Sequence, residues 1–473
     1  MFAGVHTLNH VSSSVGLRAR CLVVLLAVVA GIPASAQDFF RELGTSRSSG
    51  GIGPVIPSEY SLRDGTPSAL RKVKPPTPGE DDERYNMAVG PVRMSVAVGG
   101  GIEWNDNVFL SDDNRESDFV LRPLVNVDFM WPFSEYNSLS FSIGASWAKY
   151  LDHSELDTGG LLISPTSNLT LSMQAGPFTI TLRDRFSYQE EPYDVATISN
   201  VAKYERYENQ AGLEIDWPIN EKTFLTFGYD HYNLWTASDE FSDQDRSIDT
   251  IFLRPSYQLT PAVRIGLFAS YSFIDFDSET RADSGAIMVG PFVDMQLSDY
   301  VTLYVEAGYQ SMSFDGTSIY DGDFEAGLSR EFRELSEEDQ KQFEESDDSN
   351  AWYAKVQLTH TPNDIFEHGL IFTKTAELGF GSNFYDLYHL EYGATYKGIK
   401  DTEISPLLFA EFYETSGNFS EEAWRYGAAI GIRHHFSNSL TVGLDYRFLL
   451  KESNIEDADY YQNLVFLSAY YRF

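Results

Sequence analysis

Cysteine is almost absent from this sequence: its 473 residues include one, Cys21. That cysteine opens an apolar run, CLVVLLAVVAGI, which follows Arg18 and Arg20 and precedes the small residues at 34–36. A basic start, a short apolar run and an A-x-A site are typical of a cleaved secretory signal. We therefore expect residues 1–36 to be removed after Ala36. The mature chain would then have no disulfide and no cysteine metal site.

Basic residues are also scarce, with 34 Lys and Arg against 70 Asp and Glu. Removal of residues 1–36 takes away two arginines and no acids, which leaves 32 basic and 70 acidic side chains and a net charge of −38. Nucleic-acid binding needs a basic patch, so this balance argues against nucleic acid as a partner. It favours a surface that concentrates cations.

Long apolar runs and catalytic signatures are missing as well. No run of 18 apolar residues follows the first 40 positions, which argues against a transmembrane helix. There is no G-x-S-x-G, no H-E-x-x-H and no P-loop. His434 and His435 are neighbours that would point to opposite faces of a strand. The oxygen-rich stretches 112–114 and 321–323 match no calcium loop. We predict no enzyme activity, no cofactor and no metal.

What the sequence does contain is many aromatic residues, 28 Tyr, 33 Phe and 7 Trp, set in a period-two pattern. The last stretch, 460–473, shows the pattern, because every second residue from Phe473 back to Val465 is apolar. Such alternation indicates a β-strand with one apolar face. The apolar row is Phe473, Tyr471, Ala469, Leu467 and Val465, and the other row holds Arg472, Ser468 and Gln462 with Leu464 and Phe466 as apolar exceptions.

The same pattern recurs about 18 times over residues 91–473, and the connections between the repeats are alternately short and long. Short turns at one rim and long loops at the other are typical of transmembrane barrels. We predict an all-β fold, a transmembrane antiparallel up-and-down β-barrel of about 18 strands, with short periplasmic turns and long acidic extracellular loops. The strands are expected to begin near 92, 118, 138, 161, 178, 206, 223, 247, 263, 285, 301, 350, 365, 385, 403, 424, 440 and 460.

Two segments depart from the strand pattern. Residues 37–90 are rich in Gly, Ser and Pro, which predicts a flexible periplasmic linker, with a docking segment as the alternative. The connection 314–350 carries 13 acids between Asp315 and Asp348, and part of it has helical spacing. It would either narrow the lumen or remain a solvated loop.

Three stretches resemble known outer-membrane proteins. The terminal strand ending in Phe473 resembles the closing strand of bacterial outer-membrane barrels, whose last aromatic is read by the barrel assembly machinery. GIEWNDNVF (101–109) and LGFGSNFYD (378–386) resemble segments of the β-barrel porin type 2 family, with similar barrels in exopolysaccharide gene clusters. The resemblance implies a pore or exporter in the Gram-negative outer membrane, in contact with its lipids and lipopolysaccharide, and no catalytic residues.

The inward faces of the expected strands carry charges of both signs, which predicts a wet lumen wide enough for a channel. The leading hypothesis is an outer-membrane pore or exporter that passes small solutes or a secreted polysaccharide. A structural or adhesive barrel with a filled lumen is the alternative, and a barrel enzyme acting on envelope lipids is a third class. We take Tyr471 and Phe473 as the assembly signal. The expected lumen-facing residues are Arg93, Arg122, Arg183, Arg185, Arg254, Arg264, Arg425, Arg433, Arg447, Glu103, Asp128, Glu214, Asp216, Glu306 and Asp445.

Overall fold

The computed structural model describes a chain that forms one closed barrel. The described residues are 85, 87–192, 195–316, 318–319, 344–345, 348–417 and 420–473. The expected signal peptide, nearly all of 37–90 and most of 314–350 lie outside these residues, so the expectations about them stay predictions. None of the helical segments within the described residues has the length and apolar character needed to cross a membrane.

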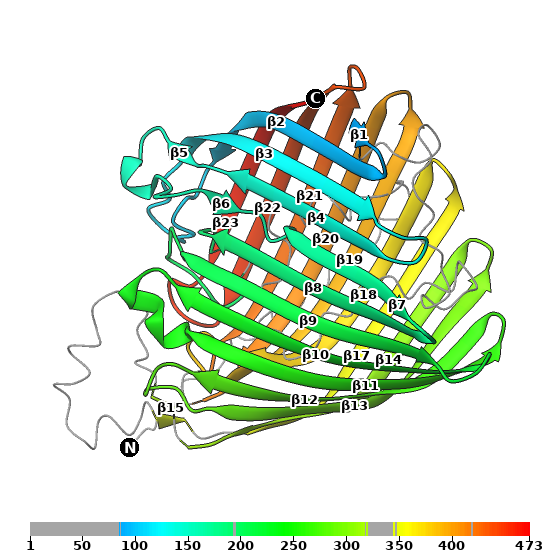
Figure 1. The fold of residues 1–473 in the computed structure, drawn as a ribbon. Coiled ribbons are helices and arrows are strands. Elements are labelled where there is room, and N and C mark those ends of the chain that lie inside the picture. Colours follow the sequence, from blue (N-terminus) through cyan, green and yellow to red (C-terminus); the bar gives the residue numbers. More distant parts are fainter. Residues whose placement is uncertain are drawn as a thin grey trace, which may run out of the picture.

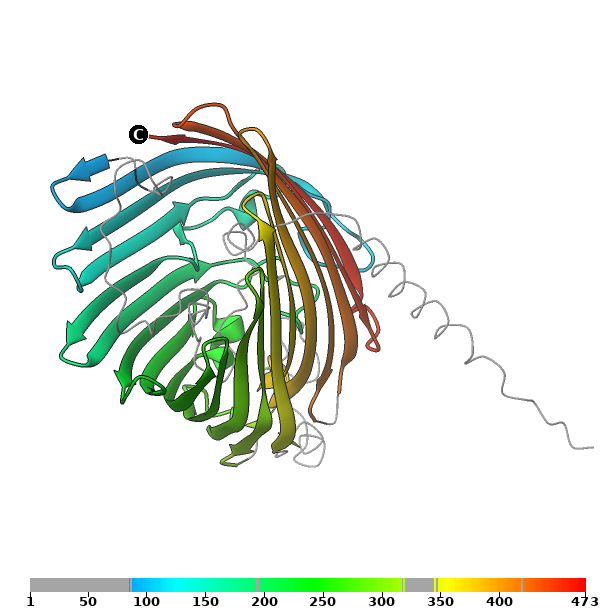
Figure 2. The same ribbon diagram turned by 90° about the vertical axis from the view of Figure 1, so that its right-hand side faces the viewer.

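Eighteen antiparallel strands follow one another around the wall in chain order, which confirms the predicted fold class (Figure 1). The last strand, β23 (Tyr460–Arg472), pairs with the first, β2 (Val92–Asn105). The blue and red strands lie side by side in both views (Figures 1 and 2). This pairing closes the sheet, so neither terminal strand has a free edge along the paired length.

The remaining wall strands have regular lengths and define two ends of the barrel. Short turns such as 219–222 lie at the short-turn end, and connections such as 190–205 lie at the long-loop end. The strands are β3 (Asp118–Pro132), β4 (Ser138–Ser146), β7 (Asn168–Ala175), β8 (Phe178–Gln189), β9 (Arg206–Pro218), β10 (Thr223–Thr236), β11 (Arg246–Thr260), β12 (Val263–Phe276), β13 (Ser284–Ser298), β14 (Val301–Phe314), β17 (Ser349–Asn363), β18 (Phe366–Leu378), β19 (Phe384–Ile399), β20 (Thr402–Thr415), β21 (Glu422–His435) and β22 (Leu440–Ser453).

Short elements decorate this wall at its rims. One of them, β1, pairs with the start of β2 at the short-turn end, and η5 lies in the connection between β10 and β11. These elements are β1 (Met87–Val89), β5 (Lys149–Tyr150), η4 (Ser154–Leu156), β6 (Leu162–Ile163), η5 (Asp239–Gln244), β15 (Ser318–Ile319) and β16 (Glu344–Glu345).

The expected strand starts agree with the structure to within two residues, with one exception. The strand expected near 161 is interrupted: β6 ends at Ile163, and β7 begins only at Asn168. Pro165 lies in the gap and has no N–H to contribute to the ladder. Gly144 on β4 bonds to this gap instead, because its carbonyl accepts from the Ser164 N–H at 2.9 Å and its N–H donates to the Ser167 hydroxyl at 3.2 Å.

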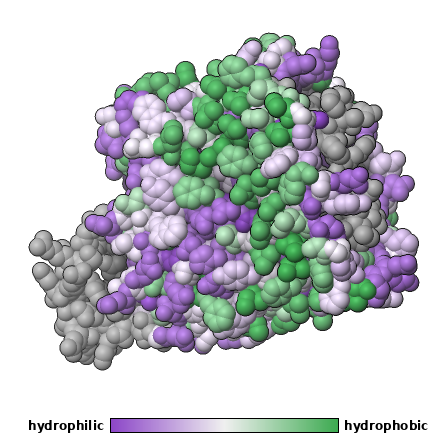
Figure 3. All heavy atoms as spheres, in the orientation of Figure 1, coloured by the Kyte–Doolittle hydropathy of each residue, from purple (hydrophilic) through white to green (hydrophobic). Residues whose placement is uncertain are grey.

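Alternate residues face opposite sides of the wall, and the outward side is apolar. On β22, Leu444 is 45% exposed, whereas the adjacent Asp445 is 2% exposed and faces the lumen. Apolar side chains form a belt across the outer face, with polar groups gathered toward both ends (Figure 3). The large exposed aromatics on this face include Trp131, Trp147, Trp217, Tyr257, Tyr309, Trp352, Tyr446 and Tyr471.

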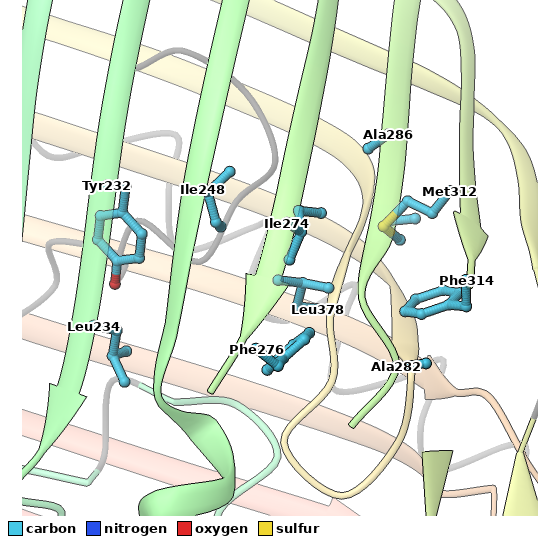
Figure 4. Packing of buried hydrophobic residues seen from close by; sticks show 11 residues of the cluster. Tyr232, Leu234, Ile248, Ile274, Phe276, Ala282, Ala286, Met312, Phe314 and Leu378 are labelled. Carbon is cyan, nitrogen blue, oxygen red and sulfur yellow. The ribbon is translucent and has the colours of Figure 1, made fainter. Parts of the chain in front are cut away.

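The interior is not uniformly polar, in contrast to our expectation of a wet lumen. An apolar cluster lies inside the wall near the long-loop end, with members on β10 to β14 and on the end of β18 (Figure 4). Leu464 and Phe466, the apolar exceptions on the polar row of β23, are also buried inside. These apolar side chains are sheltered from water because segments of the chain fold into this end of the barrel, as described below.

The two faces of β22 give a direct test of the register. Arginine facing lipid at mid-membrane costs roughly 2–4 kcal/mol, while lumen positions tolerate charge. We expect Leu444→Arg to lower the free energy of unfolding in lipid by about that amount, and Asp445→Arg to lower it clearly less. Urea titration of the refolded protein in bilayers measures both. Equal losses, or a larger loss at Asp445, would mean that these faces are assigned the wrong way round.

Candidate functional site: a loop folded into the lumen

Residues 190–192 and 195–205, in the connection between β8 and β9, extend inside the barrel to the connection between β22 and β23. At the tip, the Ser199 hydroxyl donates to the carbonyl of Ala458 at 2.8 Å, and the Asn200 side-chain amide donates to the carbonyl of Asp457 at 2.9 Å. Both acceptors lie in the connection between β22 and β23. The described residues of this connection, 190–192 and 195–205, are here called the inserted loop, which therefore joins segments more than 250 residues apart in the chain.

The inserted loop also touches the first connection of the barrel. The Asn200 N–H donates to the carbonyl of Leu110 at 3.1 Å. Leu110 is held there by Asn107, whose side-chain oxygen accepts from the Ser111 N–H at 3.0 Å and whose amide donates to the carbonyls of Ser111 and Tyr461 at 2.8 and 2.9 Å. Asn107 belongs to the GIEWNDNVF stretch, so this stretch builds a turn that ties β2 to β23 and supports the inserted loop.

A buried lysine completes the contact at the tip. Lys451 on β22 is 1% exposed, and its ammonium forms an ion pair with Glu421 at 2.9 Å. The same ammonium donates to the Ser199 hydroxyl at 2.8 Å, and Glu421 accepts from the Ser453 hydroxyl at 2.7 Å. A charge buried without partners costs several kcal/mol, so a docked Ser199 helps to satisfy this lysine.

The base of the inserted loop is anchored by charge. Arg122 on β3 bonds to Glu103 through two nitrogens, at 2.9 and 3.1 Å, and to the Glu191 carboxylate at 3.1 Å. Burial raises the pKa of Glu191, but the Arg122 charge and backbone N–H groups outweigh it, so the net pKa lies below its ordinary value. Burial dominates at the adjacent Glu190, whose pKa is raised although Lys203 lies 3.3 Å away.

The middle of the inserted loop is apolar. Ile198 and Tyr204 are each 2% exposed and pack with Phe241 and Phe380, which come from two other connections. The Tyr204 ring meets those of Phe241 and Phe380 edge to face, with centroids 5.1 and 5.2 Å apart. Aromatic edge-to-face pairs add about 0.5–1.5 kcal/mol beyond their buried area. The inserted loop is therefore fixed by packing as well as by polar contacts.

Neighbouring connections close around the inserted loop. The Gln244 amide donates to the carbonyl of Phe380 at 2.8 Å, and Arg281 donates to the carbonyls of Gly379 and Ser382 at 3.1 and 3.3 Å. A cavity of about 50 Å³ lies between the inserted loop and β18 to β21. Its lining includes Tyr204, Arg246, Glu411 and Arg425. This volume holds a few water molecules.

The structure places all fifteen predicted lumen residues on the inner face, although their part in permeation stays a prediction. Many stand beside an opposite charge or a polar partner instead of alone. The contacts are Arg122–Glu103 at 2.9 Å, Arg183–Asp230 at 2.7 Å, Arg183–Glu214 at 4.0 Å, Arg185–Gln210 at 3.0 Å, Arg254–Glu306 at 3.5 Å, Arg425–Glu411 at 2.9 Å, Asp128–Ser142 at 2.7 Å, Asp216–Thr226 at 2.6 Å, Arg264–Gln258 at 3.3 Å and Arg447–Gln462 at 3.3 Å.

The remaining predicted residues mark the short-turn half. Arg93 lies at the short-turn rim, where it donates to the carbonyl of Gly90 at 3.0 Å. Arg433 and Asp445 occupy inner positions on β21 and β22 that are diagonal neighbours in the ladder. The predicted residues thus divide into two groups. Those near Arg122 and Arg425 lie at the level of the inserted loop, and those near Arg93 and Arg433 lie closer to the short-turn end.

Sequence reasoning missed the inserted loop and assigned a possible constriction only to 314–350. A signal was present: Val195, Ile198, Val201 and Tyr204 make this connection apolar, whereas the loops that were singled out are acidic. An apolar segment that is too short for a strand pair and lies between two wall strands has to be buried somewhere. In a barrel with an apolar outer face, the remaining place is the lumen.

An ion pair on the outer face was also missed. Lys374 on β18 lies 2.6 Å from Asp386, and the rings of Trp352 and Tyr388 each lie 5.7 Å from its ammonium. The side chain of Lys374 is only 2% exposed. Pairing between β17 and β18 ends at Ala354↔Lys374, so this residue sits where the two strands part. Alternation assigns a face to each residue but not a partner.

No group of three or more His, Cys, Asp or Glu side chains that could hold a metal ion occurs within the part of the chain that the structure describes. Residues 112–114 fall within that part, and residues 321–323 fall outside it. His434 contacts the Thr402 hydroxyl at 2.9 Å, and His435 contacts that of Thr441 at 2.9 Å. The two neighbours thus have separate partners.

No family model and no curated protein sequence matches this chain. Among solved structures, Pseudomonas aeruginosa OpdQ is similar with 11% identity and a TM-score of 0.42, covering 81% of this chain and 99% of its own. The outer membrane protein OpdK of P. aeruginosa has 9% identity and a TM-score of 0.41, over 80% and 99%. Acinetobacter baumannii OccAB4 has 10% identity and a TM-score of 0.41, over 83% and 100%.

Glu190 and Glu191, at the base of the inserted loop, should differ in how their replacement by Gln changes the free energy of unfolding. Glu191→Gln removes one of the two carboxylate partners of Arg122 and should lower the free energy of unfolding by about 1–3 kcal/mol at pH 7. Because its pKa is lowered, the Glu191 contribution is present above the ordinary value near 4.3 and is lost as pH falls through the lowered pKa. Glu190→Gln should be neutral or stabilising, because burial already disfavours the ionised form.

Denaturant titrations between pH 3 and pH 7 measure both effects. The wild-type protein should lose stability at the acid end more steeply than Glu191→Gln. A Glu191→Gln variant that matches the wild type at every pH, or a greater loss in Glu190→Gln, would contradict this assignment.

Proposed function

We propose that the protein is a Gram-negative outer-membrane channel for small solutes whose conductance is limited by the inserted loop. The observation that carries the proposal is the loop docked from wall to wall inside a closed barrel. The barrel has no enzymatic role in this proposal. Solutes pass through the lumen, and the channel is narrow while Ser199 and Asn200 remain docked on the far side.

The outer face supports a place in a membrane. Exposed apolar side chains such as Leu267, Leu444 and Leu467 are 45–54% exposed, and a soluble protein rarely carries an apolar belt of this extent. The aromatics toward the ends of the strands suit the polar boundary of a bilayer. Backbone pairing around the closed sheet meets the requirement that peptide groups in lipid be satisfied.

The inner face supports passage of solute. Below the inserted loop the lumen carries Arg183, Arg254, Asp294 and Glu306, a set of charged groups that an apolar core would exclude. An 18-stranded barrel is wide enough for an aqueous channel unless it is plugged. The inserted loop then acts as a partial plug. A barrel that served only as a structural element would be filled along its whole length.

Finer assignments belong to the same proposal. The GIEWNDNVF and LGFGSNFYD stretches support a relationship with the β-barrel porin type 2 family, in which a polysaccharide is a possible cargo class. Residues 1–36 are proposed as the signal peptide and 37–90 as a periplasmic segment. Tyr471 and Phe473 are proposed as the signal for the assembly machinery, since their rings pack at 5.1 Å and the Phe473 N–H donates to the Val96 carbonyl.

Exchange of the tip of the inserted loop tests the proposal. Replacement of residues 196–202 by a Gly/Ser linker removes Ile198, Ser199 and Asn200 and should raise single-channel conductance several-fold in planar bilayers. The same linker placed at the exposed turn 278–280 is the control and should leave conductance unchanged. An absence of channel current in both the wild type and the 196–202 variant would favour a filled structural barrel.

Removal of residues 320–345 tests the charge of the outer mouth. The connection carries 13 acids between Asp315 and Asp348, which would concentrate cations within about 8–10 Å at physiological salt. The deletion should shift the reversal potential toward anions, and the shift should shrink at 1 M salt, where the screening length is about 3 Å. A reversal potential that does not move at low salt would mean that these acids do not face the permeation path.

A further inference from the structure

Two histidines face one another across neighbouring strands on the outer side of the barrel. His360 on β17 and His368 on β18 are direct partners in the ladder, four residues or fewer from the turn at the short-turn end. Nδ1 of His360 lies 2.8 Å from Nε2 of His368. Both side chains are half-buried on the outer face, so the pair is accessible from outside the barrel and not from the lumen.

The 2.8 Å separation is that of a hydrogen bond between the two rings, and it is also a separation that two nitrogen ligands of one metal ion can have. With metal–nitrogen bonds of about 2.0 Å, nitrogens at adjacent corners of a square lie about 2.8 Å apart, and at two corners of a tetrahedron about 3.3 Å. Square-planar or tetragonal sites with nitrogen and oxygen ligands suit Cu²⁺ and Ni²⁺, and Cu²⁺ binds most tightly in the divalent series. The pair in its present position therefore fits tetragonal Cu²⁺ better than tetrahedral Zn²⁺.

Contacts on the side away from His360 orient the ring of His368. Its other nitrogen, Nδ1, lies 3.4 Å from the Tyr392 hydroxyl, and its ring stacks on Phe366 with centroids 5.1 Å apart. When Nδ1–H of His368 donates to the Tyr392 hydroxyl, Nε2 presents its lone pair to His360. The hydrogen shared by the pair can move to Nε2 of His360, so that both facing nitrogens bind a metal without net loss of a proton.

We propose that His360 and His368 form a surface site for a tetragonal divalent cation of the copper class, with water in the remaining positions. No third His, Cys, Asp or Glu joins them within the described residues, so the site has two protein ligands. The acidic chain, with an expected net charge of −38 after removal of residues 1–36, favours the approach of a cation. This site is separate from the lumen and does not depend on the proposed channel activity.

Cu²⁺ titration of the untagged, refolded protein tests the site, with calorimetry for affinity and electron paramagnetic resonance for the ligands. We expect one Cu²⁺ per chain with two imidazole nitrogens, and weaker binding of Zn²⁺. His360→Gln or His368→Gln should each lower the Cu²⁺ affinity by at least about tenfold. His434→Gln is the matched control, because His434 lies on the same face and at the same end but has a threonine partner.

Unchanged affinity in His360→Gln or His368→Gln would overturn the proposal, as would a loss confined to His434→Gln. Zn²⁺ binding as tight as Cu²⁺ would overturn the tetragonal geometry. If a variant does not fold, the wild type gives a second readout: peroxide with bound Cu²⁺ oxidises nearby side chains. Oxidation mapped by mass spectrometry to His360 or His368 would support the site, and oxidation elsewhere alone would refute it.

Discussion

The structure depends on one constraint: every backbone N–H and C=O in a lipid-facing sheet needs a hydrogen-bond partner. Most of these groups bond to a neighbouring strand, and side chains bond to the others where two strands are not paired. Where β18 leaves β17, the Gln310 amide bonds to the N–H and the carbonyl of Ala376 at 3.0 and 2.8 Å. Where β6 and β7 are separated, the Ser167 hydroxyl accepts a hydrogen bond from the Gly144 N–H. The barrel is thus continuous in hydrogen bonding although it is irregular in places.

The closing seam shows how this constraint extends to function. Pairing of β2 with β23 ends near Asn105, and the side chains of Asp106 and Asn107 then continue the contact with the last strand. The turn that they form holds the Leu110 carbonyl where the Asn200 N–H can reach it. Closure of the wall and docking of the inserted loop therefore depend on the same few residues, and a weaker seam would also loosen the proposed constriction.

Period-two alternation and the alternately short and long connections were together enough to predict the barrel, its strand count and nearly all strand starts, because both patterns are local. It also assigned Leu444 and Asp445 to their faces. The docking partners of the inserted loop could not be predicted, because its contacts with Ala458 and Lys451 join distant parts of the chain. The break near Pro165 was missed because one proline among alternating residues does not show which neighbour takes over its hydrogen bonds.

A single engineered disulfide tests most directly whether the inserted loop is docked inside the barrel and limits conductance. The mature chain is expected to contain no cysteine, so Asn200→Cys with Asp457→Cys would introduce the sole pair. We expect oxidation of the folded protein in outer membranes to link the two positions, the linked channel to conduct no more than the wild type, and reduction to restore wild-type behaviour. Failure of the folded protein to form the link, or high conductance in the linked form, would contradict this expectation.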